Sequence, residues 1–391
     1  MSEIDRKVYG LLVGSVIGDA AGGPVEFRDR RTVGDRLPGF RDTPDKTVDA
    51  AGLRRLSETF PMLPYAPIRM GQEPYGQWID GAPAGTSTDD TRNKIVLLDA
   101  LRAGMSAGSN EVTRERLAQA YLDFASRPEI AENEGWDKLC SDGFDEFWQS
   151  ARWELGQRDL AVAVPSSRMW NGVGTCCGMM TLPPLAGLYP GDPERAYLAA
   201  YGVAFFDNGL GKDINAALVG AMAFALAQPT PGDSREERHA AWRATIQSLA
   251  DTDPLRYGEI MFMGREAAKW IERGKEAAKD AGGSPAKLYR LIEEKCQKEH
   301  AWEAHFLLFQ MVAIAEFCPG EPLAAMHLAL DYGQDTDSIA QLLGAMYGAI
   351  YGPDIFPEPM RELVETRLEE QHGESLRDWV SVIRTAREAG E

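Results

Sequence analysis

Two short acidic clusters contain the residue types and spacing best suited to chemistry. They are residues 88–91 (TDDT) and 335–338 (DTDS). Each supplies two carboxylates and at least one hydroxyl, which is more than the single side-chain oxygen that a helix N-cap requires. Closely spaced carboxylates repel one another, so holding them together requires protons or a cation. Oxygen-only ligands of this kind suit Mg²⁺, Mn²⁺ or Ca²⁺ rather than zinc.

Each cluster stands directly before an apolar helical pattern, at 92–103 and at 339–351. Asp, Ser and Thr are also preferred helix N-caps, where a carboxylate gains from the helix dipole. Taken singly, each cluster therefore also fits a simple cap. The pair together favours a shared cation site, which requires these two distant segments of the chain to converge.

Other catalytic arrangements have little support. The five histidines show no HExxH-type spacing, and none lies near either cluster in sequence. Zinc or Ser-His-Asp chemistry is therefore not expected. A third element, residues 18–26 (GDAAGGPVE), predicts a helix that ends in a glycine-rich turn and is followed by the carboxylate of Glu26. Taken alone, this is typical of a helix end with an exposed glutamate.

The elements that position these residues are predicted to be helices. Stretches rich in Ala, Leu, Glu and Arg recur, and alternating Val, Ile and Thr runs are nearly absent. Helices are expected at 9–21, 92–103, 114–125, 214–227, 236–250, 264–281 and 339–351. Gly10, Gly14 and Gly18 recur every four residues along the first of these, and small residues recur along the last. A repeated glycine stripe indicates close approach of a neighbouring backbone.

The expected fold class is all-α, with one compact orthogonal multi-helix domain over residues 1–391. No internal repeat, low-complexity tract or linker divides the chain. Residues 29–85 are expected to form an irregular excursion or lid, since loops of such length are usually functional or mobile. Residues 359–391 are expected to be a charged, solvated helical tail.

Composition limits the kinds of binding partner and the cellular compartment that are expected for the protein. The formal net charge of the 391 residues is −19, and a surface of that charge would repel nucleic acid or an anionic membrane. Five cysteines without a CxxC pair are typical of reduced thiols in the cytoplasm. The N-terminus lacks a signal-peptide pattern, and the apolar run 8–21, interrupted by Asp19, is too short to span a bilayer. We expect a cytoplasmic monomer with no nucleic-acid or membrane partner.

Together the three elements resemble the ADP-ribosylglycohydrolase family, which includes the dinitrogenase reductase-activating glycohydrolase and the ADP-ribosyl-acceptor hydrolases. The 14–26 run, the TDDT tetrad and the late DTDS before a small-residue helix follow the family's order. Further agreement comes from Met179-Met180 and from residues 184–193 (PLAGLYPGDP). The resemblance spans most of residues 8–352.

The resemblance implies an all-helical fold with a binuclear Mg²⁺ centre, or Mn²⁺ in some members, at the bottom of a cleft. It implies two ligand sets, Thr88, Asp89 and Asp90 and then Asp335, Asp337 and Ser338. Glu26 matches a glutamate that approaches the metals in some members. Cleavage at C1 of ribose develops oxocarbenium character and needs a positioned water and a proton for the departing atom. Glu26 or Asp90 is the candidate acid or base.

The segment expected to contact the substrate departs from the family pattern. Members tend to have Gly-Asn-Gly here, with an arginine after the methionine, whereas this chain has residues 171–178 (NGVGTCCG) and Thr181 after Met180. Asp207 stands where many members place a histidine, although it fits a helix cap equally well. Backbone amides of the 172–178 loop could still bind a diphosphate, or the loop is an ordinary glycine-rich turn. The candidate substrate-binding residues are Gly174, Thr175, Cys176, Gly178, Met179 and Asp207.

The sequence thus predicts a Mg²⁺-dependent hydrolase that removes an ADP-ribosyl group from a protein side chain or a small molecule. A small nucleoside-type or other N- or O-glycoside is the alternative substrate, which the altered loop favours. A third hypothesis is a non-catalytic module that binds ADP-ribosylated protein, and the intact acidic ligand set argues against it. Cys176 and Cys177 are expected to line the pocket, because no activating base is apparent for a nucleophile.

Overall fold

The computed structural model describes residues 1–26, 40, 46–60, 83–127, 138–262, 264–296 and 301–390. Over these ranges the structure is helical and has no β-strand, only an isolated bridge between Thr175 and Glu303. The α-helices are α1 (Glu3–Gly22), α3 (Ala50–Thr59), α4 (Asp89–Ser106), α5 (Arg114–Ala125), α7 (Lys138–Glu154), α8 (Cys177–Thr181), α9 (Pro193–Val203), α10 (Gly209–Ala227), α11 (Arg235–Asp251), α12 (Glu266–Ala281), α13 (Pro285–Cys296), α14 (Ala304–Phe317), α15 (Pro322–Tyr332), α16 (Thr336–Tyr351), α17 (Glu358–His372) and α18 (Leu376–Gly390). Short 3₁₀ helices are η1 (Gly23–Val25), η3 (Ser166–Gly172), η4 (Pro183–Leu188), η5 (Tyr257–Glu259) and η6 (Pro353–Ile355). The all-α prediction is confirmed.

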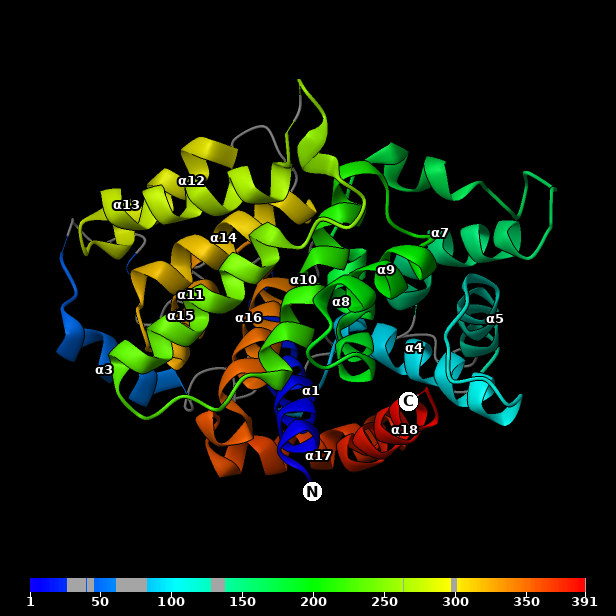
Figure 1. Ribbon diagram of the computed structural model, residues 1–391, viewed down its shortest axis with the longest axis horizontal. Helices are drawn as coiled ribbons and strands as arrows, with labels where there is room; N and C mark the ends of the chain where they lie inside the picture. Colours follow the sequence, from blue (N-terminus) through cyan, green and yellow to red (C-terminus); the bar gives the residue numbers. More distant parts are fainter. Residues whose placement is uncertain are drawn as a thin grey trace.

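The centre of the molecule is the pair formed by α1 and α16 (Figure 1). A Cβ added to Gly14 would lie 2.2 Å from the carbonyl oxygen of Gly344, and one added to Gly18 would lie 2.1 Å from that of Ala340. No side chain beyond hydrogen fits at these positions, so the two backbones touch directly. The glycine stripe therefore marks a close approach, as the sequence predicted, and its partner is the small-residue helix near the C-terminus.

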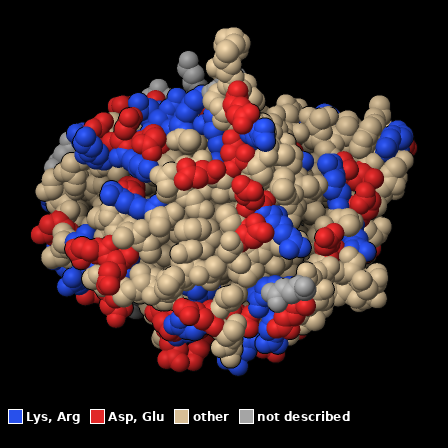
Figure 2. Space-filling model, in the orientation of Figure 1, with Lys and Arg blue, Asp and Glu red and all other residues tan. Residues whose placement is uncertain are grey.

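The other helices surround this pair. The helices α4, α5 and α7 lie on one side, and α11 to α15 with α3 lie on the other (Figure 1). The helix α10 packs against α9, α11, α14 and α16. On the face drawn in Figure 2, Lys and Arg are interspersed with Asp and Glu and gather over α12 and α13. The net negative charge therefore does not form a continuous acidic layer on this face.

Several expected helices begin earlier or end later than the sequence pattern indicates. The first extends to Glu3–Gly22, because the Ser2 side chain accepts the Asp5 N–H and caps it. The helical stretches Glu3–Val25 and Gly209–Ala227 are each long and apolar enough to cross a membrane by length and composition, the first being longer than the apolar run 8–21. Within the fold, 89% and 78% of these two apolar stretches are buried. Buried core helices of globular proteins have this same composition.

Two further expectations are corrected. Part of the 29–85 excursion is the helix α3, where the Asp49 side chain accepts the Gly52 N–H, while 27–39, 41–45 and 61–82 lie outside the described residues. The C-terminal segment is not a solvated tail. Its two helices, α17 and α18, pack on α1, Trp379 is completely buried, and Arg387 pairs with Asp5 at 2.6 Å. An apolar stripe on α18 accounts for this packing.

Candidate metal centre and active site

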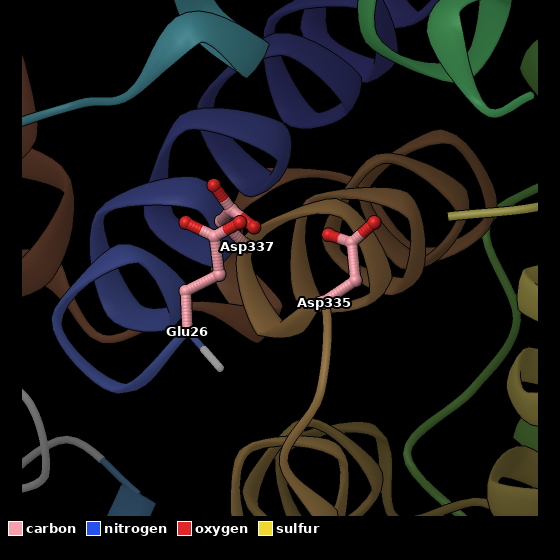
Figure 3. A group of neighbouring side chains, drawn as sticks. All are labelled: Glu26, Asp335 and Asp337. Carbon is pink, nitrogen blue, oxygen red and sulfur yellow. The ribbon is translucent and has the colours of Figure 1, made fainter. Parts of the chain in front are cut away.

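The two acidic clusters meet at the C-terminal end of α1. Carboxylate oxygens of Glu26, Asp335 and Asp337 lie within 4.8 Å of one another, and so do those of Asp89, Asp90 and Asp337. Figure 3 shows the first group, with Glu26 and Asp337 close together beside α1 and Asp335 at the beginning of α16. Asp337 belongs to both groups. The convergence that the sequence analysis required is therefore confirmed.

The first cluster is held in place by Asp19 of α1. The Asp19 carboxylate accepts the backbone N–H of Thr88 at 3.0 Å and that of Thr91 at 3.0 Å, and the hydroxyls of both threonines donate to it as well. The Thr88 hydroxyl in turn accepts the Asp90 N–H at 3.2 Å and so caps α4. Thr88 thus has a structural role that is independent of any ligand.

Sequence reasoning missed Asp19, which it treated only as an interruption of an apolar run. The signal was present, because a carboxylate inside a buried helix is costly unless donors surround it. Burial raises the pKa of Asp19, and the hydrogen bonds from Thr88 and Thr91 lower it. Asp19 therefore fixes the beginning of α4 relative to α1.

The second cluster opens α16 with a different geometry. Gln334 precedes it with φ of 71°, and the Asp335 side chain makes no N-cap hydrogen bond. Asp337 accepts the Ser338 N–H at 2.9 Å, and the Ser338 hydroxyl donates to Oδ2 of Asp90 at 3.4 Å. The Asp335 carboxylate instead lies against Ser338, whose hydrogen bonding lowers its pKa, and its Oδ2 is 3.9 Å from Sγ of Cys176.

One buried oxygen tests whether a cation fits here. Oδ1 of Asp90 is buried and accepts no hydrogen bond from the described part of the chain. A buried carboxylate oxygen without a donor is costly, and a divalent cation would relieve that cost. All the clustered donors are oxygens, which suits Mg²⁺ or Mn²⁺. The residues present therefore fit a hard cation.

The electrostatics of the cluster lead to the same conclusion. Burial raises the pKa of Glu26 well above its usual range, and the charges of Asp335 and Asp89 add to the effect. Burial likewise raises the pKa of Asp90 and that of Asp337 well above the ordinary value, and it raises the pKa of Asp335 to about 6. Without a cation, the protonated forms of Glu26, Asp90 and Asp337 are favoured, and a bound cation would take the place of those protons.

The predicted substrate loop lies against this centre. Sγ of Cys176 is 3.9 Å from Oδ2 of Asp335 and 3.8 Å from Oγ of Ser338. Burial raises the pKa of Cys176 well above its ordinary value, so the thiol is protonated and suited to lining a wall. Gly174 packs directly on Gly211, where an added Cβ would lie 2.5 Å from the backbone nitrogen.

Asp207 supports this loop from behind. Its Oδ1 accepts the Gly178 N–H at 3.1 Å, and its Oδ2 accepts from Nδ2 of Asn215 at 2.9 Å. The same Asn215 nitrogen donates to the Thr175 carbonyl at 3.0 Å. Burial raises the pKa of Asp207 to about 7. Asp207 therefore positions the loop, a role that its sequence context did not reveal.

These contacts limit one expectation about the loop, that its backbone amides bind a diphosphate. The Gly178 N–H donates to Asp207, and the Cys176 N–H donates to the Trp302 carbonyl at 2.9 Å. Those two amides are used within the protein in this arrangement, so they are not available to bind a diphosphate. The carbonyl of Met179 accepts from Nε2 of Gln341 at 3.1 Å, which ties the loop to α16.

The fold and site define an all-helical protein with an acidic, oxygen-only candidate metal centre. The sequence profile of the ADP-ribosylglycohydrolase family matches residues 1–389. A solved structure described as an ADP-ribosylglycohydrolase-related protein complex is similar over 100% of both chains, with a TM-score of 0.54 at 15% identity. At that identity the likeness concerns the fold. Comparison with curated protein sequences gives no significant match. The chain belongs to the ADP-ribosylglycohydrolase family.

Proposed function

We propose that the protein is a Mg²⁺-dependent hydrolase that cleaves the C1 glycosidic bond of an ADP-ribosyl group on a protein side chain or a small molecule. The observation that carries the proposal is the meeting of two carboxylate groups that share Asp337. Membership of the ADP-ribosylglycohydrolase family supports the choice of substrate class. The buried, unpartnered Oδ1 of Asp90 supports the need for a cation.

The ligands fall into two sets around Asp337. The proposed ligands are the carboxylates of Asp89, Asp90, Asp335 and Asp337, with the hydroxyls of Thr88 and Ser338. Two divalent cations bound there, Mg²⁺ or Mn²⁺, would supply positive charge that orients ribose hydroxyls and acidifies water. The Thr88 hydroxyl already contacts Asp19 and the Asp90 N–H, so it is the weakest member of the ligand set.

Glu26 is the better placed of the two candidate acid–base residues. It is half-buried, whereas Asp90 is buried. Burial and the charge of Asp335 raise the pKa of Glu26 well above its ordinary value, which favours its protonated form and suits it to proton exchange. In hydrolysis, a water oxygen bonds to C1 as the bond from C1 to the leaving atom breaks, and Glu26 exchanges a proton with one of these oxygen or nitrogen atoms.

The test is release of ADP-ribose from ADP-ribosylated protein in MgCl₂, in MnCl₂ and in EDTA. We expect release that requires the cation and is lost in Asp337→Asn. Asp233→Asn removes a fully exposed carboxylate and is the matched control. Release that survives both chelation and Asp337→Asn would contradict the proposal.

A smaller glycoside is the second candidate substrate. The internal use of the Gly178 and Cys176 amides supports it, because the loop then offers fewer donors to a diphosphate. Turnover of free nucleosides without release from ADP-ribosyl protein would establish this alternative. Tight binding of ADP-ribosylated protein without turnover of either substrate would indicate a non-catalytic module instead.

A further inference from the structure

Behind the carboxylates lies a second buried polar group, built from Ser15, Lys94 and Gln341. All three side chains are fully buried. Nζ of Lys94 donates to the Asp90 carbonyl at 2.9 Å and to Oε1 of Gln341 at 3.1 Å. The same Gln341 oxygen accepts from Oγ of Ser15 at 2.9 Å. Because Nε2 of Gln341 also donates to the Met179 carbonyl, the group joins α1, α4, α8 and α16.

Among the residues that the structure describes, the charge of Lys94 has no direct ionic partner. No carboxylate oxygen of the described residues lies within ion-pair distance of its Nζ, whose hydrogen bonds go to a carbonyl and an amide oxygen. A buried ammonium group is costly without opposite charge nearby. The carboxylates that interact electrostatically with it are those of the centre, Asp90, Asp19, Asp89 and Asp337. The charge of Lys94 therefore interacts with several carboxylates of the centre and is not paired with a single one.

We propose that Lys94 is a resident counter-cation of the centre, a positioning residue that offsets the carboxylate charge when no divalent cation is bound. This inference rests on the proposed function, since it takes the carboxylates as cation ligands. Without Lys94, the carboxylates lose one positive charge, and Arg92, whose charge acts on Asp89, remains beside any bound cation. The metal-free protein should then lose stability, and by linkage the cation should bind more tightly.

The chain contains a matched control in Lys7. This lysine is also fully buried, and its Nζ donates to the carbonyls of Ala225 and Gln228 at 2.8 and 2.7 Å, at the end of α10. Its electrostatic partners are Glu3 and Arg6, not the carboxylates of the centre. Lys7→Met therefore removes the same kind of group without changing the field at the centre.

The experiment compares Lys94→Met and Lys7→Met with the wild-type full chain at one pH. Thermal unfolding is followed in EDTA and in saturating MgCl₂, and the Kd for Mg²⁺ is measured by calorimetry. For Lys94→Met we expect a loss of Tm on the order of 10 °C in EDTA, less than half that loss in MgCl₂, and Mg²⁺ binding on the order of tenfold tighter. For Lys7→Met we expect equal losses in both buffers and an unchanged Kd.

The outcomes separate the two proposals. A wild-type protein that neither Mg²⁺ nor Mn²⁺ stabilises would overturn the proposed metal centre and, with it, the role of Lys94. A wild-type protein that Mg²⁺ stabilises, with equal losses of Tm for Lys94→Met in both buffers, would overturn the role of Lys94 alone. Should Lys94→Met fail to fold, Lys94→Gln keeps a donor for the Asp90 carbonyl without the charge and carries the same expectations.

Discussion

The acidic centre and the loop at 174–178 lie against each other, yet they use their polar groups in opposite ways. In the centre, Oδ1 of Asp90 has no donor among the described residues and Asp335 makes no cap hydrogen bond. In the loop, both oxygens of Asp207 accept hydrogen bonds, and Nδ2 of Asn215 serves two acceptors. The centre therefore keeps a carboxylate oxygen without a donor, whereas the carboxylate that supports the loop is fully hydrogen-bonded and only the amide oxygen of Asn215 beside it lacks a donor among the described residues of that network.

On the proposed function, this difference indicates that the centre binds the cation and substrate and that the loop forms a fixed wall of the site. Groups that the fold leaves without partners are the ones a cation or substrate can engage. Groups that the fold satisfies hold the wall of the site in position. Cys176 lies where the two regions meet, 3.9 Å from Asp335. If this is correct, substitutions in the centre should change catalysis and cation binding, and substitutions in the loop should mainly change stability.

The largest effect is expected from Asp337→Asn. The substitution removes a negative charge from both carboxylate groups at once, because Asp337 belongs to each. We expect kcat/KM to fall by about 10³-fold or more and the stabilisation by Mg²⁺ to disappear. Thermal unfolding with and without MgCl₂ checks the second point. If Asp337→Asn kept the full Mg²⁺ effect, the centre would not be the cation site.

The next effect concerns the packing that brings the centre together. In Gly14→Val the new Cβ would lie 2.2 Å from the Gly344 carbonyl oxygen, so α16 must move away from α1. We expect a loss of about 3 kcal/mol in the free energy of unfolding, together with weaker Mg²⁺ binding. Urea unfolding in EDTA and calorimetry measure the two quantities.

Gly202→Ala is the control for this packing. Among the described residues, no atom outside the adjoining backbone of α9 lies within 4 Å of a Cβ at Gly202, so alanine there should be neutral or stabilise by up to about 1 kcal/mol. Equal effects of Gly14→Val and Gly202→Ala would show that the contact between α1 and α16 does not hold the centre.

The sequence pattern was most informative where a residue type is itself unusual. Gly14 and Gly18 predicted a close helix contact because few other roles explain a glycine stripe in a helix. The composition of the acidic clusters predicted that they converge, because each has two carboxylates and a hydroxyl, whereas a helix N-cap uses one side-chain oxygen. The family resemblance then identified both clusters with one centre, and the structure brings them together.

The positioning residues could not be predicted in this way. Asp19, Lys94 and Gln341 act through partners on other helices, and sequence spacing does not say which buried donor will face which acceptor. Asp207 was assigned to the substrate, whereas the hydrogen bonds of its carboxylate go to Gly178 and Asn215. The packing of α18 was missed because its many charged residues obscured an apolar stripe.

A pH-dependent effect is expected from Asp207. Its pKa is about 7 in the folded protein because of burial, against an ordinary value of 3.8. Between these values the folded state holds a proton that the unfolded state has lost, so this group lowers the free energy of unfolding as pH rises from about 4 to 7. The effect levels off above pH 7.

Asp207→Asn lacks this titration. Relative to the variant, the wild type should therefore lose about 2–3 kcal/mol of stability between pH 5 and pH 7. Urea unfolding of both proteins at each pH, with EDTA throughout, measures the difference. If the difference in free energy of unfolding stays constant across this range, Asp207 is ionised throughout. Its carboxylate, and not its protonated carboxyl, would then hold the loop.

The smallest effect is expected at Cys176, where the two regions meet. Burial and the charge of Asp335 raise the pKa of Cys176 well above its ordinary value, so the thiolate needed for a nucleophile is disfavoured. Cys176→Ser replaces the thiol with a smaller donor toward Asp335, and we expect kcat/KM to change by no more than about threefold. Cys177→Ser is the matched control, because Sγ of that neighbouring residue accepts from the Thr175 hydroxyl at 3.0 Å, and the carboxylate charges that act on it are those of Asp207 and Asp89. A loss far larger than threefold in Cys176→Ser alone, or a ribosyl adduct on Cys176 in the mass spectrum, would place reaction chemistry in the loop and erase the contrast between the two regions.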